Sequence, residues 1–399
     1  MSRKRVVAVF TGNRAEYGLQ FPILKAINAH PKLEYRLIVS GAHLDPHFGH
    51  TLEEIRRDGF KVHAEVKIKM TADTRVSTAN AIGSGIISMS AALEKIRPDI
   101  LVVYADRFEG FAALVAGTQM NVPTAHVEGG DITEGGALDD SVRHAMTKLA
   151  HLHFTTNAQA RRRILAMGEA SWRVHNVGFP AIDLISQGLF ATPGDVRRLY
   201  GLVDERPVVL FTQHSVTTCF DRAAAQIRPA LKALTILGRR GVQVVATYPN
   251  NDAGGRAIIR ELEAFRKKAI PNTQVHKNLG RHNYHGILNY IGRVSGGACV
   301  GNSSSGIKET PAFACPTINI GSRQDGRLRA ANVIDTGYDS GEILAAYERC
   351  VSDSSFLRRC RTAKNPYGRG DAGRKIADAL AKVRLDQTLI TKEMTIRCP

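Results

Sequence analysis

The sequence predicts an α/β protein made of two doubly wound, Rossmann-like domains that face a central cleft. Short runs of β-branched and other apolar residues alternate with longer helical patterns along the chain, which is typical of parallel sheets covered by helices. This alternation pauses in the turn-rich region 180–205 and then starts again. The length of 399 residues also favours two cores of ordinary size over one.

The strands and helices of the first half follow from this alternation. Each candidate strand is nearly continuous in apolar residues, as expected for a strand buried on both faces. We expect strands at 6–11, 35–40, 100–105, 124–128, 153–156 and 174–177, and helices that include 17–29, 107–120 and 140–151.

The second half repeats the pattern after Pro207. We expect strands at 208–212, 242–247, 273–276, 298–300 and 317–320, with helices that include 223–237 and 255–268. The predicted N-terminal domain covers 1–185 and the C-terminal domain 186–385. The final helix of the C-terminal domain, 373–382, is expected to pack back on the N-terminal domain, and 386–399 to form a loosely held tail.

Composition and charge narrow the class of protein. The net charge of +17 is spread along the whole chain without a nucleic-acid-binding motif, so an anionic small substrate is a better explanation than DNA or RNA. The six cysteines include no C-x-x-C pair, which favours reduced thiols. The apolar run 6–10 is too short for a signal peptide, and the weakly polar stretch 80–93 is shorter than the ~20 residues of a membrane span. We expect a cytoplasmic protein without membrane insertion.

Acidic side chains follow the predicted strands of the first half. Asp106 and Glu128 each come at a strand end, and Asp139 opens a helix after a glycine-rich loop. Ligands of doubly wound sheets bind beyond the carboxyl ends of the strands, although Asp106 and Asp139 are also suited to capping helices. Clustered carboxylates raise one another's pKa, so that one can act as an acid while another acts as a base.

Other polar groups are suited to a phosphate. Arg14 follows the first strand, where Gly12 permits a tight turn and a helix N-terminus can bind an anion. His214 follows the first strand of the second half and can donate to a leaving phosphate. Ser303 and Ser304 precede a helix and can form an anion site. Glu309 can accept bonds from ribose hydroxyls, and Arg323 can reach a phosphate or a base. The turn after the first strand has no G-x-G-x-x-G pattern, which argues against a dinucleotide dehydrogenase, and the serine loop is not a P-loop.

Taken together, these motifs resemble those of the hydrolysing UDP-N-acetylglucosamine 2-epimerases of sialic-acid biosynthesis, which share the glycosyltransferase-B fold with the non-hydrolysing epimerases. The matching stretches occur in the same order and are NRAEY at 13–17, ADRFE at 105–109, HVEGG at 126–130, LDDSVRH at 138–144, QH at 213–214, YPN at 248–250, GNSS at 301–304 and RQ at 323–324.

The resemblance implies roles for individual residues. It makes Asp106, Glu128 and Asp139 the catalytic carboxylates and His214 the histidine near the diphosphate. The nucleotide and substrate contacts that it implies are Arg14, Arg107, Asn250, Ser303, Ser304, Glu309 and Arg323. It also implies a UDP-linked sugar as substrate, no metal and no cofactor, and we expect a homodimer or homotetramer.

The expected reaction releases the nucleoside diphosphate by elimination to a glycal and then adds water with inversion at C2. The run at 139–144 resembles the hydrolysing branch of the family more than the reversible one. Ala105 departs from the family, which has glycine before the first catalytic Asp, and this bears on which sugar is accepted. GDP or a 2,4-diacetamido sugar remains an alternative for the substrate.

Three other functions remain open. A non-hydrolysing epimerase would give a UDP-linked product, a glycosyltransferase would leave C2 unchanged, and a sugar-nucleotide sensor would bind without turnover. Three carboxylates around the sugar are more than simple transfer or sensing requires, which favours the hydrolysing epimerase.

Overall fold

The computed structural model describes residues 3–44, 51–68, 75–133, 138–250 and 253–396. The chain forms two compact units. The first comprises 1–132, 138–183 and 367–399, and the second comprises 133–137 and 184–366.

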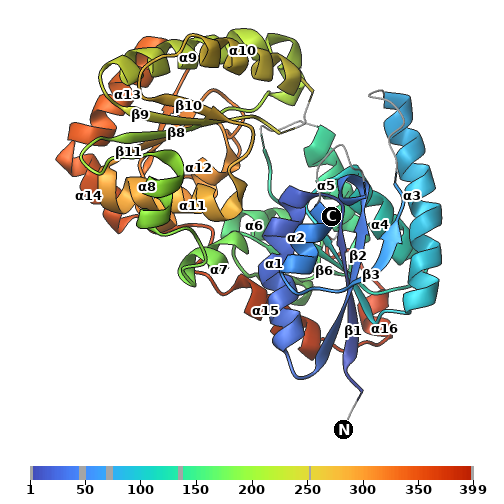
Figure 1. The fold of residues 1–399 in the computed structure, drawn as a ribbon. Helices are drawn as coiled ribbons and strands as arrows, with labels where there is room; N and C mark the ends of the chain where they lie inside the picture. The colour runs from blue at the N-terminus through green and yellow to red at the C-terminus, as the bar shows by residue number, and fades with distance from the viewer. Residues whose placement is uncertain (1–2, 45–50, 69–74, 134–137, 251–252, 397–399) are drawn as a thin grey trace. The chain divides into compact units, whose positions relative to one another are not determined.

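The first unit is built on a seven-stranded parallel sheet (Figure 1). Its strand order is β3-β2-β1-β4-β5-β6-β7. The chain adds strands outward on one side of β1 and then, from β4 onward, on the other side, as is typical of doubly wound sheets. The strands are β1 (Arg5–Thr11), β2 (Leu33–Ser40), β3 (Val62–Val66), β4 (Ile100–Tyr104), β5 (Thr124–Val127), β6 (Leu152–Thr155) and β7 (Val174–Asn176).

Helices cover both faces of this sheet. Alternate residues of β1 point to opposite sides, with Val7 and Val9 in one core and Ala8 and Phe10 in the other. The helices are α1 (Arg14–Ala29), α2 (Thr51–Arg57), α3 (Arg75–Ile96), α4 (Phe108–Gln119), α5 (Leu138–Leu149), α6 (Ala158–Ala166), α7 (Ala181–Ser186), α15 (Ala372–Lys382) and α16 (Gln387–Ile390), with 3₁₀ turns η1 (Gly41–His43) and η3 (Ser171–Arg173).

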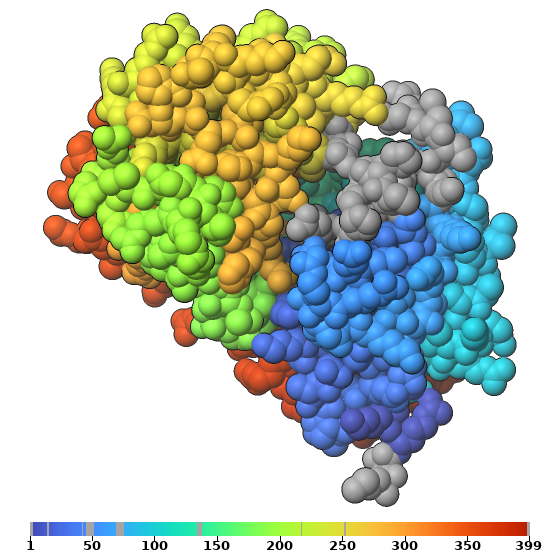
Figure 2. Space-filling model, in the orientation of Figure 1, coloured from blue at the N-terminus to red at the C-terminus, as the bar shows by residue number. Residues whose placement is uncertain are grey.

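The C-terminal segment completes the first unit. Helix α15 packs against α1, and the surface of this segment lies beside the N-terminal helices in Figure 2. The sequence predicted a loosely held tail, but residues 389–392 are bound to the first unit. Arg173 donates hydrogen bonds to the carbonyls of Leu389 and Thr391, both at 2.8 Å. Lys392 forms an ion pair with buried Glu169 at 2.9 Å.

The second unit has a six-stranded parallel sheet with the order β10-β9-β8-β11-β12-β13. The strands are β8 (Val208–Thr212), β9 (Gln243–Thr247), β10 (Thr273–His276), β11 (Gly297–Gly301), β12 (Thr317–Ile320) and β13 (Val333–Thr336). The helices are α8 (Pro193–Tyr200), α9 (Ala223–Arg239), α10 (Gly255–Lys267), α11 (Gly280–Tyr290), α12 (Ser304–Lys308), α13 (Ser340–Ser352) and α14 (Ser354–Thr362), with short turns η4 (Thr217–Arg222), η5 (Ile291–Ser295) and η6 (Thr310–Phe313).

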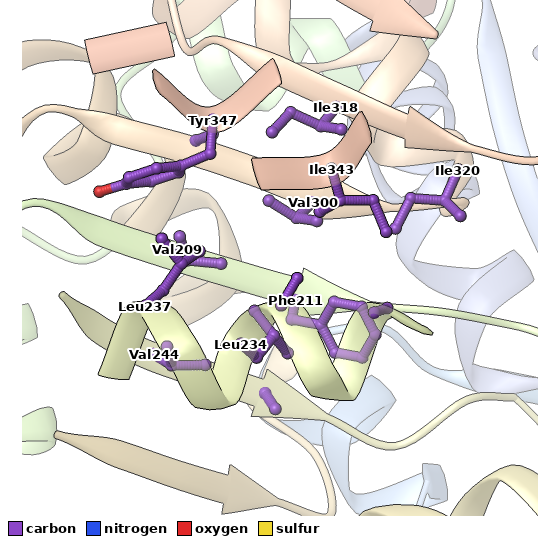
Figure 3. Close-up of a cluster of buried hydrophobic side chains, with 14 of the residues drawn as sticks. Val209, Phe211, Leu234, Leu237, Val244, Val300, Ile318, Ile320, Ile343 and Tyr347 are labelled. Atoms are coloured by element: carbon purple, nitrogen blue, oxygen red, sulfur yellow. The ribbon is translucent and has the colours of Figure 1, made fainter. Parts of the chain in front are cut away.

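Figure 3 shows the core between this sheet and two of its helices. Buried hydrophobic residues of α9 and α13 pack on the strands, and burial of this apolar surface stabilises the unit. The labelled residues are Val209, Phe211, Leu234, Leu237, Val244, Val300, Ile318, Ile320, Ile343 and Tyr347.

The predicted fold class is confirmed, and the differences lie at the sheet edges and in one helix. The sequence prediction missed β3 and β13, the outermost strands of their sheets. It noted the weakly polar stretch 80–93 but named no helix there, whereas the structure has α3, of which 76–96 is long and apolar enough to cross a membrane by length and composition alone. Only 28% of that stretch is buried, and one such helix is weak evidence for a membrane span.

Candidate functional site

Strands β4 and β5 end in residues with a strained backbone. Ala105 has a φ of +56° and Glu128 a φ of +68°, a region that costs a non-glycine residue about 1–3 kcal/mol. The two strand ends are neighbours, since Tyr104 pairs with Val127 and the Ala105 N–H donates to the Val127 carbonyl at 2.9 Å. Strain at adjacent strand ends of a parallel sheet marks this edge as a functional site.

Asp106 follows Ala105, and a buried arginine holds its carboxylate. Arg143 of α5 forms an ion pair with Asp106 and lies 3.4 Å from an oxygen of Asp140. The Arg143 side chain is only 3% exposed. A guanidinium has a planar fork of donors, so this contact fixes the direction of the Asp106 carboxylate.

Asp139 and Asp140 lie in the first turn of α5 and differ in exposure. Asp139 is exposed, whereas Asp140 is buried and lies on the helix face of Arg143. Of the three predicted carboxylates, Asp106 and Glu128 therefore follow neighbouring strands, and Asp139 lies on the outer side of the first turn of α5.

Glu128 is buried among polar groups of the same sheet edge. Its side chain lies near the hydroxyl of Tyr104, and Asp131 is also buried there. Burial, followed by the charge of Glu128, raises the pKa of the Tyr104 hydroxyl well above its usual value. Tyr104 therefore stays protonated beside this carboxylate.

The turn after β1 contains a second buried carboxyl group. The Gly12 N–H donates to Glu16 at 2.6 Å, and Asn13 caps α1 by accepting from the Glu16 N–H at 3.0 Å. Burial raises the pKa of Glu16 to about 8, and the nearby charge of Glu109 adds to this effect. Glu16 is thus a helix-capping group that carries a proton near neutral pH.

Two arginines of the first unit, Arg14 and Arg107, are predicted substrate contacts, and the structure describes the side chain of Arg107 only. The Arg14 side chain lies outside the described part, and only its backbone, at the start of α1, is described. The Arg107 side chain is 46% exposed, and its Nε lies 3.5 Å from Glu109. Arg107 is therefore accessible to a ligand.

In the second unit, His214 follows β8 and contacts Asn250. The backbone N–H of Asn250 donates to His214 Nδ1 at 3.1 Å, and the Asn250 side-chain amide lies 3.0 Å from the same nitrogen. A backbone N–H can only donate, so we place the ring proton on Nε2. Burial and the charge of Arg323 lower the pKa of His214 to about 3. The ring is therefore neutral and can offer its Nε2–H to an anion.

Asn302 fixes the backbone around this histidine. Its side chain accepts from the His214 N–H at 2.6 Å and donates to the His214 carbonyl at 2.9 Å, while Arg323 donates to the Asn302 carbonyl at 3.3 Å. Gly301 is required before it, because a Cβ there would lie 2.0 Å from the Thr212 carbonyl oxygen. The ends of β8 and β11 are thus tied together.

The predicted serine loop opens the short helix α12. Ser303 is its N-cap and accepts from the Ser305 N–H at 3.4 Å, and Ser304 is its first residue. Glu309 follows the helix and is buried, with one oxygen 2.9 Å from His285 Nε2.

Several of these groups were missed by the sequence analysis as site residues. Arg143 and Asn302 lie inside the quoted motifs, but nothing in the sequence shows that they hold Asp106 and His214. The only signal in the sequence is that each lies close to a candidate residue. Arg143, for example, comes one helical turn after Asp139. His285 lies within α11, and no local pattern marks it as the partner of Glu309.

No group of three or more His, Cys, Asp and Glu with the arrangement of a metal site occurs within the residues that the structure describes. The predicted contacts thus consist of carboxylates, cations, hydroxyls and an imidazole.

Two doubly wound sheets with acidic groups at one carboxyl edge and a neutral imidazole, an arginine and hydroxyls at the other define an enzyme of nucleotide-linked substrates. The chain belongs to the UDP-N-acetylglucosamine 2-epimerase family, whose model matches residues 25–381.

Two relatives are named as hydrolysing 2-epimerases. The chain is 32% identical to the GDP/UDP-N,N'-diacetylbacillosamine 2-epimerase (hydrolyzing) of Campylobacter jejuni over 88% of each chain. It is 30% identical to the UDP-N,N'-diacetylbacillosamine 2-epimerase (hydrolyzing) of Legionella pneumophila, over 89% of this chain and 94% of the relative.

The fold is also that of a solved structure. UDP-GlcNAc 2-epimerase from Neisseria meningitidis, bound to UDP-GlcNAc, superposes with a TM-score of 0.80 at 18% identity, over 95% of this chain and 100% of that one. The predicted family, fold and enzyme class, a hydrolysing 2-epimerase, are therefore confirmed.

Proposed function

We propose that the enzyme converts a UDP-linked N-acetylamino sugar, with UDP-N-acetylglucosamine as the first candidate, into UDP and the free sugar inverted at C2. The observation that carries this proposal is the carboxylate edge of the first unit. Asp106, held by Arg143, and Glu128, on a strained backbone, follow neighbouring strands. The names of the hydrolysing relatives support the same reaction.

The reaction balances in two steps. In the first, a base removes the proton from C2 and the bond between C1 and the diphosphate oxygen breaks. The electron pair of that bond leaves with UDP, and a C1=C2 double bond forms. In the second, water adds at C1 and a proton returns to C2 from the opposite face, which inverts that carbon.

The first unit supplies the carboxylates that these steps require. Asp106, Glu128 and Asp139 are proposed to stabilise positive charge at C1, to remove the C2 proton and to activate water. Arg107 is proposed to contact the substrate, since its guanidinium is accessible. Arg14 is proposed to contact the diphosphate, on the basis of its position after β1.

The second unit is proposed to hold the nucleotide. The neutral ring of His214 donates its Nε2–H to the departing diphosphate, and Arg323 adds a positive charge beside it. Asn250 orients the histidine and contacts the nucleotide. Ser303 and Ser304 donate to the phosphates, and Glu309 accepts from the ribose.

A second candidate substrate is UDP-N,N'-diacetylbacillosamine or its GDP-linked form. The Campylobacter and Legionella relatives are named for this 2,4-diacetamido sugar, and a relative from Neisseria meningitidis, at 31% identity, is named for UDP-N-acetylglucosamine. We further propose a cytoplasmic homodimer or homotetramer that requires neither a metal nor a cofactor.

The test is a panel assay in deuterated water. Purified enzyme is incubated with UDP-N-acetylglucosamine and with the UDP- and GDP-linked 2,4-diacetamido sugars, and proton NMR follows the products. We expect free sugar with deuterium at C2, released together with the nucleoside diphosphate. A product that stays linked to UDP, or that keeps hydrogen at C2, would contradict the proposal. Chelator-treated enzyme serves as the control for a metal requirement.

A further inference from the structure

The strained peptide that precedes Asp106 is bound on both sides by strand β5. The N–H of Ala105 donates to the Val127 carbonyl at 2.9 Å. The carbonyl of Ala105 lies 2.6 Å from Nε2 of His126. A carbonyl can only accept, so the histidine must donate here. Ala105 thus has both backbone groups satisfied while it keeps a left-handed conformation.

His126 is itself fixed from the other side by helix α5. Its Nδ1 lies 3.2 Å from the hydroxyl of Thr147. Burial lowers the pKa of His126 to about 4, so the ring is neutral and Nδ1 carries no proton. The single Thr147 hydroxyl proton lies between two acceptors, His126 Nδ1 and the Arg143 carbonyl at 3.0 Å. Gly129 makes room for this contact, because a Cβ there would lie 2.8 Å from the Thr147 hydroxyl and 2.9 Å from His126 Nδ1.

Helix α5 therefore contacts Asp106 by two routes. Arg143 pairs directly with the Asp106 carboxylate, and Thr147, one turn further along the same face, holds the ring that holds the Ala105 carbonyl. The ion pair with Arg143 fixes the direction of the Asp106 carboxylate. The contacts through Thr147 and His126 fix the conformation of the backbone that carries the Asp106 side chain.

We propose that His126 is a positioning residue that locks the strained Ala105 peptide and thereby aims Asp106 at the reacting sugar. This proposal rests on the proposed function, in which Asp106 takes part in the chemistry. Position 105 is alanine in this chain, where the motif of the family has glycine. The histidine supplies a hydrogen bond that compensates for the conformational cost of the extra methyl group.

The experiment compares two variants of His126 with the wild type on the sugar nucleotide that gives turnover. His126→Phe keeps a ring of similar volume but removes the donor, and His126→Gln keeps an N–H donor. A misplacement of a catalytic group by about 1 Å can cost about 100-fold in rate. We therefore expect His126→Phe to lower kcat on the order of 100-fold with little change in KM, and His126→Gln to recover most of that loss.

The variant Ala105→Gly tests the route through the backbone. Glycine adopts a positive φ without steric cost, so the Phe substitution at His126 should cost several-fold less kcat in the Ala105→Gly background. His153→Phe is the matched control, because His153 is buried in the neighbouring strand and bonds to Glu169 instead. It should lower the melting temperature while the folded enzyme keeps its kcat.

Hydrogen exchange provides a readout that does not depend on the substrate. The Ala105 amide should exchange faster in His126→Phe than in the wild type and in His126→Gln. Equal kcat losses in both Ala105 backgrounds, or equal losses for Gln and Phe, would overturn the positioning role. A wild-type enzyme without turnover on the whole panel would instead contradict the proposed function, and normal exchange at Ala105 in His126→Phe would reject the positioning role by itself.

Discussion

Arg143 forms an ion pair with Asp106, although the two residues come from different elements, helix α5 and the end of strand β4. The guanidinium is only 3% exposed. Breaking a buried pair by removing one partner leaves a carboxylate without its cation, which typically costs about 3–5 kcal/mol. Removal of Arg143 therefore destabilises the first unit and also frees the direction of the Asp106 carboxylate.

A pair of substitutions at Arg143 separates these two roles. Arg143→Lys keeps the charge but loses the planar fork, so we expect kcat to fall about 10–100-fold with a modest loss of stability. Arg143→Met should lower the free energy of unfolding by about 3 kcal/mol. Chemical denaturation and steady-state kinetics measure the two effects. A lysine variant with full activity would show that the fork does not direct Asp106.

Replacing the Asp106 carboxylate should abolish turnover without unfolding the protein. Asp106→Asn is nearly isosteric, and the second unit, to which UDP binding is assigned, is unchanged. We expect no detectable release of sugar and a UDP affinity close to that of wild type, because most of the nucleotide contacts are assigned to the second unit. Calorimetric titration with UDP is the check. A lower melting temperature is expected in any case, because buried Arg143 loses the charge of its partner. Loss of UDP binding by the folded variant would assign Asp106 a structural role.

The backbone strain at Glu128 gives a prediction that separates the effect of its positive φ on stability from the role of its carboxylate in turnover. With a φ of +68°, this position favours glycine over any residue with a Cβ. Glu128→Gly should therefore be more stable than Glu128→Ala by about 1 kcal/mol. Both variants should lose turnover because both lack the carboxylate. If the alanine variant is as stable as the glycine variant, the positive φ is not a cost in solution.

Much of the fold could be predicted because buried parallel strands leave a clear apolar pattern. Strands β8, β10 and β12 have the predicted bounds. The edge strands β3 and β13, which are partly buried and carry polar residues such as His63 and Asp335, were missed, whereas the partly buried edge strand β10 was predicted. The predicted strands at 100–105 and 124–128 each ran one residue too far, since Ala105 and Glu128 leave the extended conformation.

The sequence predicted individual residues of the candidate site, but it did not predict which residues contact each other. Asp106, Glu128 and His214 follow strands, and that position alone selects them. The partners that direct them come from elsewhere in the sequence, 37 residues away for Arg143 and 88 for Asn302. Such pairings depend on helix packing and strand order, which no local pattern specifies.

The pair of Glu309 and His285 predicts how the second unit recognises a ribose. If Glu309 accepts from ribose hydroxyls, Glu309→Gln should weaken UDP binding about 10-fold, because hydrogen bonds to a charged group contribute about 1.5–3 kcal/mol. The ligand 2'-deoxy-UDP provides the matched control. It should bind wild type more weakly than UDP does, and Glu309→Gln should narrow this difference. An unchanged preference for UDP would exclude Glu309 from ribose recognition.

The raised pKa of Glu16 predicts a dependence of stability on pH. Its pKa is about 8 in the folded protein against an ordinary value of 4.5, chiefly because of burial. Below pH 4.5 the carboxyl group is protonated in both the folded and the unfolded state, so its contribution to stability is complete. Between about 4.5 and about 8 only the unfolded state loses the proton, and the free energy of unfolding falls as the pH rises.

Glu16→Gln should remove this part of the pH dependence, because the amide stays neutral and can still accept from the Gly12 N–H. At pH 8 we expect the variant to exceed the wild type in unfolding free energy on the order of a few kcal/mol, and the two to converge near pH 4.5. Urea unfolding at several pH values measures the difference. Glu94→Gln, at a side chain that is 71% exposed, should follow the wild-type curve. A Glu16 variant that also follows the wild-type curve would mean that this carboxyl group ionises normally in the folded protein.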